Sequence, residues 1–197
     1  MAKIKVAITG NTGSGKSTVA ELLRNRGIPV VDADRIAHEV ISMPEIRERI
    51  KAEFGPEFVT PEGLVDRKRL GRKVFSDPAS LRKLNAIMRP KIAFLLGKAM
   101  DEVRGDLVAV DGALVFEYGL EGIFDRVVVV VSDPQEMVRR SARKTGYSED
   151  DIRKILSAQM PQEEKAMKAW FVIENRGSLE DLEKQVDALV ERLRSGE

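Results

Sequence analysis

A glycine-rich segment near the start of the chain limits the possible folds more than any other feature. Residues 10–17 read Gly-Asn-Thr-Gly-Ser-Gly-Lys-Ser, which fits the Gly-x4-Gly-Lys-Ser/Thr spacing of a phosphate-binding loop. Glycine permits positive φ angles and close backbone approach, so successive N–H groups can point at one phosphate. Such a loop needs a strand before it and a helix after it, and the motif therefore predicts that order.

The sequence around the loop has this order. A β-branched run over residues 3–9 predicts a strand, and apolar residues at helical spacing follow the loop as far as Gly27. Residues 28–31 predict a second buried strand, which leads into Asp-Ala-Asp at 32–34. Strand, glycine loop, helix and strand together are typical of the start of a parallel α/β sheet.

Further strands are expected in the second half of the chain. Valine-rich runs at 107–111 and 126–131, with a short run at 171–174, predict three more strands. Continuous valine runs suit strands that are buried on both faces of a parallel sheet. Ser148 and Ser178 begin sequences spaced like capping boxes, and the second precedes a terminal amphipathic helix. The fold class is therefore expected to be α/β, a P-loop NTPase-type doubly wound parallel sheet of five strands.

A helical insertion is expected between the second and third strands. Residues 35–104 show no convincing strand, while Asp66 and Asp77-Pro78 are typical of helix starts, and Arg89-Pro90 predicts a break. Residues 66–98 contain ten basic and two acidic residues, which makes this stretch locally cationic.

Composition excludes several classes of site. Lys and Arg (33) nearly balance Asp and Glu (32), so no general attraction to nucleic acid is expected. The absence of cysteine excludes disulfides, thiolate metal sites and cysteine nucleophiles, and the single histidine, His38, excludes a site built from several histidines. No apolar run approaches ~20 residues and the N-terminus lacks a signal-peptide core. We expect a cytoplasmic protein with no membrane partner.

The phosphate loop predicts binding of ATP with Mg²⁺. Lys16 is expected to reach the β- and γ-phosphates, and the Ser17 hydroxyl to bind Mg²⁺. None of the asparagines stands in the Asn-Lys-x-Asp context of a switch GTPase. The expected nucleotide contacts are Asn11, Thr12, Gly13, Ser14, Gly15, Lys16, Ser17 and Thr18.

Two aspartates at predicted strand ends each have two interpretations. Asp34 follows the second strand, where a carboxylate can accept the proton of an attacking hydroxyl group, but it can equally be a helix N-cap. Asp111 follows the third strand in the position of a Walker-B aspartate, which holds Mg²⁺ through water. Its alternative is a turn residue at the end of a strand.

A cationic cluster and two isolated side chains also have alternative roles. Arg139, Arg140, Arg143 and Lys144 are expected on one helix, with 140 and 144 on a shared face. Arginines on a mobile segment could neutralise the transferring phosphoryl group, or they could form a solvated basic surface. His38 could contact substrate or have a structural role, and Trp170 is expected to pack in the core or in a lid.

Taken together, several segments resemble the dephospho-coenzyme A kinase family over nearly the whole chain. The Asp-Ala-Asp, Gln-Met-Pro and Ile-Glu-Asn-x-Gly segments, in this order, are much more specific than the phosphate loop alone. The matching segments are 10–18, 31–34 with 36–38, 63–70 with 74–75, 84–85, 89–90, Asp111 with 114–117, 157–161 with Lys165, and 172–177.

The resemblance implies ATP-dependent phosphorylation of the ribose 3′-hydroxyl group of dephospho-coenzyme A. It implies that Asp34 is the general base, that Arg140 is the arginine of a lid, and that Asn175 lies near the ATP adenine. The cationic helical insertion then binds the acceptor, whose pyrophosphate attracts cations. The expected acceptor contacts are Asp34, His38, Arg67, Arg69, Lys73 and Arg89, the last of these replacing the usual histidine of the family.

The resemblance also implies a division of the chain. Residues 1–34, 105–138 and 166–197 form the nucleotide-binding core, residues 35–104 the acceptor-binding insertion, and residues 139–165 the lid. The enzyme is expected to be a monomer or small homo-oligomer. Two alternatives remain open, a P-loop kinase for another small hydroxyl or nucleotide acceptor and an ATP-binding regulatory module that uses the 66–98 patch to bind polynucleotide.

Overall fold

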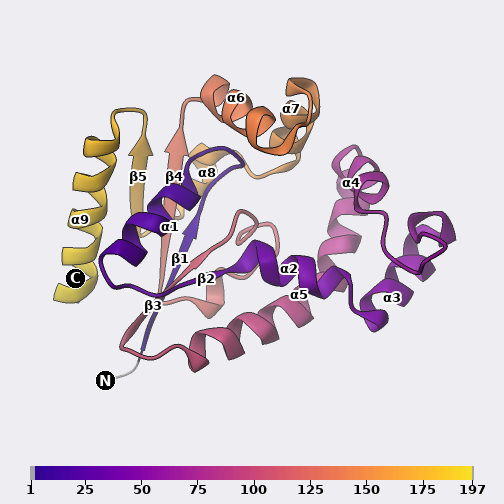
Figure 1. The fold of residues 1–197 in the computed structure, drawn as a ribbon, viewed down its shortest axis with the longest axis horizontal. Helices are drawn as coiled ribbons and strands as arrows, with labels where there is room; N and C mark the ends of the chain where they lie inside the picture. The colour runs from indigo at the N-terminus through magenta and orange to yellow at the C-terminus, as the bar shows by residue number, and fades with distance from the viewer. Residues whose placement is uncertain (1–2, 197) are drawn as a thin grey trace.

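A single parallel sheet organises the chain in the computed structural model, which describes residues 3–196 (Figure 1). Its strand order is β2-β3-β1-β4-β5, and every neighbouring pair is parallel, as predicted. The strands are β1 (Ile4–Thr9), β2 (Val30–Asp32), β3 (Leu107–Asp111), β4 (Arg126–Ser132) and β5 (Phe171–Asn175).

Nine α-helices are described between and around these strands within residues 3–196. They are α1 (Lys16–Asn25), α2 (Ala33–Ile41), α3 (Pro44–Phe54), α4 (Arg67–Phe75), α5 (Pro78–Glu102), α6 (Pro134–Thr145), α7 (Glu149–Ala158), α8 (Gln162–Met167) and α9 (Leu179–Ser195). Two short 3₁₀ turns, η1 (Pro56–Phe58) and η2 (Glu121–Ile123), complete the described elements. No helix in this part of the chain has the length and apolar character needed to cross a membrane.

The two faces of the sheet are covered by different helices because side chains alternate along each strand. Val6 and Ile8 of β1 pack with α1 and α9 on one face, whereas Ala7 packs with α2 and α5 on the other. Trp170 completes the first face, where its ring lies under the guanidinium groups of Arg126 and Arg192, 5.2 and 4.7 Å from their Cζ atoms. The packing role expected for this tryptophan is confirmed.

The strand register places three chain segments at one edge of the sheet. Ile8 of β1 pairs with Asp111 of β3, and Asp32 of β2 pairs with Asp111 from the other side. The phosphate loop leaves β1 one residue after this level, at the end of Thr9. Because parallel strands end on the same side, the loop and the last residues of β2 and β3 lie at one end of the sheet, where open α/β sheets bind their ligands.

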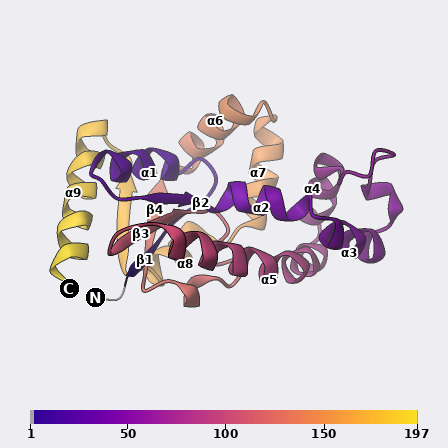
Figure 2. The same ribbon diagram turned by 60° about the horizontal axis from the view of Figure 1, so that its bottom comes forward.

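Helices α2 to α5 form an arm that extends from the sheet edge at β2 (Figures 1 and 2). Asp66 and Asp77 cap α4 and α5 as predicted, since their carboxylates accept hydrogen bonds from backbone N–H groups of the first turns. Helix α2 lies beside α5 in both views, and the two helices pack against each other. The described part of this arm contains no strand longer than one isolated bridge, between Val59 and Val65.

The break predicted at Arg89-Pro90 is wrong, because α5 continues through Pro90 as one helix of 25 residues. A proline inside a helix loses one backbone hydrogen bond and costs roughly 3 kcal/mol relative to alanine. The helix buries Met88, Ile92, Leu96 and Met100 along its length, and this burial offsets the cost. Arg49 also donates a hydrogen bond to the carbonyl group of Ile87 in the interrupted turn (3.3 Å).

We expect Pro90→Ala to raise the free energy of unfolding by about 1 to 3 kcal/mol, because alanine restores the missing N–H donor and removes the ring from the helix interior. Urea unfolding followed by circular dichroism measures this change. Ala93→Gly, one turn further along the same helix, should shift stability in the opposite direction. A Pro90→Ala variant less stable than the native protein would show that the proline conformation is favourable here.

Candidate active site

A cleft of about 980 Å³ lies at the carboxyl edge of the sheet, between the phosphate loop, the helical arm and α6. Basic, acidic and apolar side chains from these elements face it. Its lining residues are Thr12, Gly13, Gly15, Lys16, Ser17, Thr18, Asp34, Ala37, His38, Ile41, Arg67, Lys68, Leu70, Gly71, Val74, Phe75, Leu84, Met88, Asp111, Ala113, Leu114, Tyr118, Arg140, Ser141, Lys144, Thr145 and Tyr147.

The phosphate loop owes its shape to glycines in conformations that other residues rarely adopt. Gly13 and Gly15 have φ angles of 81° and 99°. A Cβ atom at Gly13 would clash with the backbone carbonyl of Met137, and one at Gly15 would clash with the Asn175 side chain. The Asn175 amide donates to the carbonyl oxygen of Ser14 (2.9 Å), so β5 supports the loop from behind. The loop therefore closes tightly enough for its N–H groups to surround an anion.

Lys16 is the first residue of α1 and is almost completely buried in the loop. Its ammonium group donates to the carbonyl oxygen of Asn11 (3.1 Å). Burial lowers the pKa of Lys16, while the nearby Asp111 and Asp34 carboxylates favour its charged form. A phosphate bound in the loop would add a further negative charge beside this ammonium group and stabilise it.

Asp111 ends β3 at the floor of the cleft. Burial raises the pKa of this carboxyl group to about 6, with Asp34 and Asp32 adding to the shift and Lys16 opposing it. Its Oδ1 atom is buried and has no hydrogen-bond partner among the described residues. A buried oxygen ligand without a partner, next to a phosphate site, suits a hard divalent cation such as Mg²⁺.

The structure separates the roles of the two aspartates at the N-terminus of α2. Asp32, and not Asp34, is the N-cap, because its Oδ1 accepts a hydrogen bond from the N–H group of Arg35 (2.8 Å). The N-cap interpretation of Asp34 is therefore wrong. Asp34 lies in the first turn of α2, is exposed to the cleft, and accepts a hydrogen bond from the N–H group of Ala113 (3.4 Å). Its carboxylate is free to contact a ligand.

Helix α6 presents only part of its cationic cluster to the cleft. Arg140 and Lys144 line the cleft together, as their spacing predicted. Arg139 and Arg143 do not line it. Glu136 lies between the first two arginines of the cluster, 2.9 Å from Arg139 and 3.9 Å from Arg140. Two of the four cations, Arg140 and Lys144, therefore face the cleft.

The helical arm brings some, but not all, of the expected acceptor contacts to the cleft. His38 of α2 and Arg67 of α4 line it, and their side chains hydrogen-bond to each other. Lys68, which the sequence did not single out, joins them.

The three other expected cations lie away from the cleft lining, and their assignment stays a prediction. Arg69 donates to the carbonyl group of Glu57 (3.0 Å), and Arg89 donates to that of Gly119 (2.8 Å). Lys73 is exposed on α4 and is also absent from the lining.

Several residues near the site were not found by sequence reasoning. Tyr118 lines the cleft in the loop after β3, and burial raises its pKa to about 12, which keeps the phenol neutral. The Gln159 side chain accepts from the N–H group of Thr12 (3.0 Å) and donates to its hydroxyl group (3.2 Å). Only the Gln-Met-Pro segment pointed to Gln159, and no local pattern pointed to Tyr118.

Comparison with known proteins agrees with these observations. The sequence model of the dephospho-CoA kinase family matches residues 4–181. Dephospho-CoA kinase of Thermus thermophilus is 42% identical over 193 residues, covering 98% of this chain and 93% of the relative, and the Corynebacterium glutamicum enzyme is 38% identical, covering 98% of each chain.

Solved structures extend the comparison to the fold. A crystal structure from Thermus thermophilus is 40% identical, with a TM-score of 0.82 and coverage of 98% of this chain and 99% of that one. Dephospho-CoA kinase of Campylobacter jejuni is 26% identical, with a TM-score of 0.67 and 98% coverage of both. A shikimate kinase from Acinetobacter baumannii, 14% identical with a TM-score of 0.58 over 99% of this chain and 95% of its own, shares the fold. The chain belongs to the dephospho-CoA kinase family.

Proposed function

We propose that the protein transfers the γ-phosphoryl group of ATP to the ribose 3′-hydroxyl group of dephospho-CoA, giving CoA and ADP. We propose that it does so in the cytoplasm. The observation that carries the proposal is the single cleft that holds Lys16 and Asp34 and continues along the cationic arm to Arg67. One ligand can lie in the loop while a second approaches it from the arm.

The nucleotide is held by the loop. Backbone N–H groups of residues 11–18 surround the phosphates, and Lys16 contacts the β- and γ-phosphates. Ser17 and Asp111 would hold Mg²⁺, which supplies charge neutralisation at the phosphates when it is bound. Asn175, which supports the loop through Ser14, is proposed to lie near the adenine.

Asp34 accepts the proton of the acceptor hydroxyl group. As this O–H bond breaks, the hydroxyl oxygen bonds to the γ-phosphorus, and the bond between that phosphorus and the leaving oxygen of ADP breaks. The proton passes to the Asp34 carboxylate, and no covalent enzyme intermediate forms. Lys16 and Arg140 stabilise the negative charge that the transferring group carries, so most of the rate acceleration comes from positioning and electrostatics.

The acceptor is held by the arm. His38, Arg67 and Lys68 form a cationic and polar group on the cleft wall that suits the pyrophosphate of dephospho-CoA. Arg69, Lys73 and Arg89 do not line the cleft, and their contact with the acceptor stays a prediction. We propose accordingly that residues 35–104 act as the acceptor-binding unit and residues 139–165 as a lid on the core formed by the remaining segments.

The direct test is an assay of ADP release with dephospho-CoA and a panel of other hydroxyl compounds, including nucleosides, sugar alcohols and shikimate. We expect kcat/KM with dephospho-CoA to exceed that with the other compounds by at least ~10³. Of these acceptors, only dephospho-CoA has a pyrophosphate that can contact the cationic residues of the arm. Turnover with another acceptor and none with dephospho-CoA would assign a different kinase. Salt-sensitive binding of polynucleotide without phosphorylation would assign the regulatory alternative.

Asp34→Asn should lower kcat by at least ~10² while the ATP dissociation constant changes by less than about threefold, because the amide fills the same space but cannot accept the proton. Steady-state kinetics and calorimetric titration with ATP measure the two quantities. Asp32→Asn is the matched control, since asparagine preserves the helix cap two residues away. Near-native turnover in Asp34→Asn would remove the general-base assignment.

Arg140→Ala should lower kcat by at least ~10-fold, because it removes a cation that faces the phosphates. Arg139→Ala, at the neighbouring position of α6, should stay within about twofold of the native rate, because that guanidinium does not line the cleft and its surface ion pair with Glu136 contributes little. Equal effects of the two substitutions on kcat would indicate that the cluster acts only through its overall charge.

Asp111→Asn should raise the Mg²⁺ concentration needed for half-maximal rate by at least ~10-fold, because the cation loses the negative charge of a carboxylate that would hold it, directly or through water. Asp106→Asn, just before the opposite end of β3, is the control and should leave this concentration unchanged. A native Mg²⁺ dependence in Asp111→Asn would place the cation elsewhere.

A further inference from the structure

A buried ion pair outside the cleft lining is linked by hydrogen bonds both to the proposed general base, Asp34, and to Lys16 of the phosphate loop. Lys165 of α8 and Glu117 of the loop after β3 lie 2.8 Å apart, and their side chains are 0% and 8% exposed. We infer that Lys165 and Glu117 are positioning residues. Through two separate chains of hydrogen bonds they fix the positions of Asp34 and Lys16 relative to each other. The inference rests on the proposed function, because it concerns the geometry of the same phosphoryl transfer.

The first chain leads from Lys165 to Asp34. The Lys165 ammonium group donates to the carbonyl oxygen of Ala113 (3.3 Å), which also accepts from the Thr9 hydroxyl group (3.4 Å). The N–H group of the same residue, Ala113, donates to Asp34 Oδ1 (3.4 Å). Lys165 therefore fixes both the position and the orientation of the backbone at Ala113, which in turn holds the carboxylate of the proposed base.

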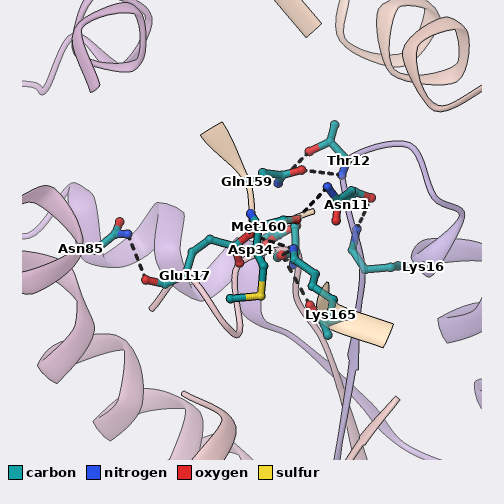
Figure 3. Close-up of polar contacts among 11 residues, drawn as sticks. Asn11, Thr12, Lys16, Asp34, Asn85, Glu117, Gln159, Met160 and Lys165 are labelled. Atoms are coloured by element: carbon teal, nitrogen blue, oxygen red, sulfur yellow. Dashed lines mark hydrogen bonds and ion pairs between the residues drawn. The ribbon is translucent and has the colours of Figure 1, made fainter. Parts of the chain in front are cut away.

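The second chain leads from Glu117 to Lys16. Glu117 Oε1 accepts from the N–H group of Met160 (3.0 Å), and the Met160 carbonyl accepts from the Asn11 side-chain amide (3.2 Å). The Asn11 carbonyl in turn accepts from the Lys16 ammonium group (3.1 Å). Figure 3 shows these side chains converging between the phosphate loop and the loop that carries Glu117.

Two further contacts anchor the ends of this arrangement. The Asn85 amide of α5 donates to the backbone carbonyl of Glu117 (3.1 Å), which ties the pair to the acceptor arm. Gln159, next to Met160, bonds to Thr12 through both ends of its amide. The pair thus lies where the arm, the end of the proposed lid and the phosphate loop meet (Figure 3).

Stability alone does not explain why a charged pair occupies the buried position of Lys165 and Glu117. Burial lowers the pKa of Lys165, and only the Glu117 carboxylate opposes that shift. Removing two charges from water costs free energy that their attraction repays only with good geometry, and apolar side chains of similar volume often stabilise as well or better. An ion pair, unlike apolar packing, fixes directions: of the three donors of the ammonium group, one serves the Glu117 carboxylate and one the Ala113 carbonyl group.

The inference is tested with the pair-deleted variant Glu117→Gln/Lys165→Met, which leaves no uncompensated buried charge and should fold. We expect kcat to fall by about 10- to 100-fold, because small misplacements of reacting groups cost this much, while the KM for ATP changes by less than about threefold. Lys165→Met and Glu117→Gln alone should each lower kcat by a similar factor, so the effects of the two are not additive.

Hydrogen exchange supplies a readout that does not depend on turnover. Amides in segments 11–16 and 112–117 should exchange faster in the pair-deleted variant than in the native protein. Val186→Ala in the core between α9 and the sheet is the matched control: it lowers the melting temperature without touching the network, and should leave kcat and exchange in these segments near native values.

The outcomes separate the inference from the proposed function. Native kcat in the folded pair-deleted variant, or unchanged exchange in both segments, overturns the positioning role. An equal loss of kcat in Val186→Ala also overturns it, because the loss would then follow stability alone. If the native protein does not phosphorylate dephospho-CoA, the proposed function fails, and faster exchange in the pair-deleted variant still demonstrates the structural coupling.

Discussion

The rest of the structure depends on how closely the backbone of the phosphate loop, at the end of the central strand β1, packs against neighbouring segments. Gly13 and Gly15 are pressed against Met137 and Asn175, which belong to the segments after β4 and to β5. Contacts with α6 and β5 thus hold the loop in place, in addition to the hydrogen bonds of its own turn. Because β1 lies between β3 and β4, the register of the sheet then decides what lies in front of the loop.

Charges in front of the loop are balanced in a partly buried setting. Burial lowers the pKa of Lys16 although the Asp111 and Asp34 carboxylates oppose the shift, and burial raises the pKa of Asp111. Mg²⁺ and a triphosphate bring charges of both signs to the same place and would stabilise both groups at once. The site is therefore better suited to the loaded than to the empty state, as expected of a kinase whose catalysis rests on positioning and electrostatics.

Much of the fold could be predicted from local pattern. The five parallel strands were predicted from β-branched and apolar runs, and the loop from its glycines. The break predicted at Pro90 was wrong, and of the two interpretations of Asp34 the N-cap was the wrong one. Helix α5 continues through Pro90 because it buries a face along its whole length, and α2 starts at Ala33, so that Asp32 and not Asp34 caps it. Among the cations, helical spacing separated Arg140 from Arg139, but it could not show which face met the cleft.

The amino-acid sequence by itself determined the order of strands and helices, the place of the phosphate loop, and the family, because these depend on residue type and spacing along the chain. Only the tertiary structure decided which charges meet. Glu117 and Lys165 form their ion pair across 48 residues of chain, and Ala113 joins Lys165 to Asp34 through backbone atoms that have no signature in the sequence. Contacts of this kind arise from sheet register and helix packing, which no local pattern encodes.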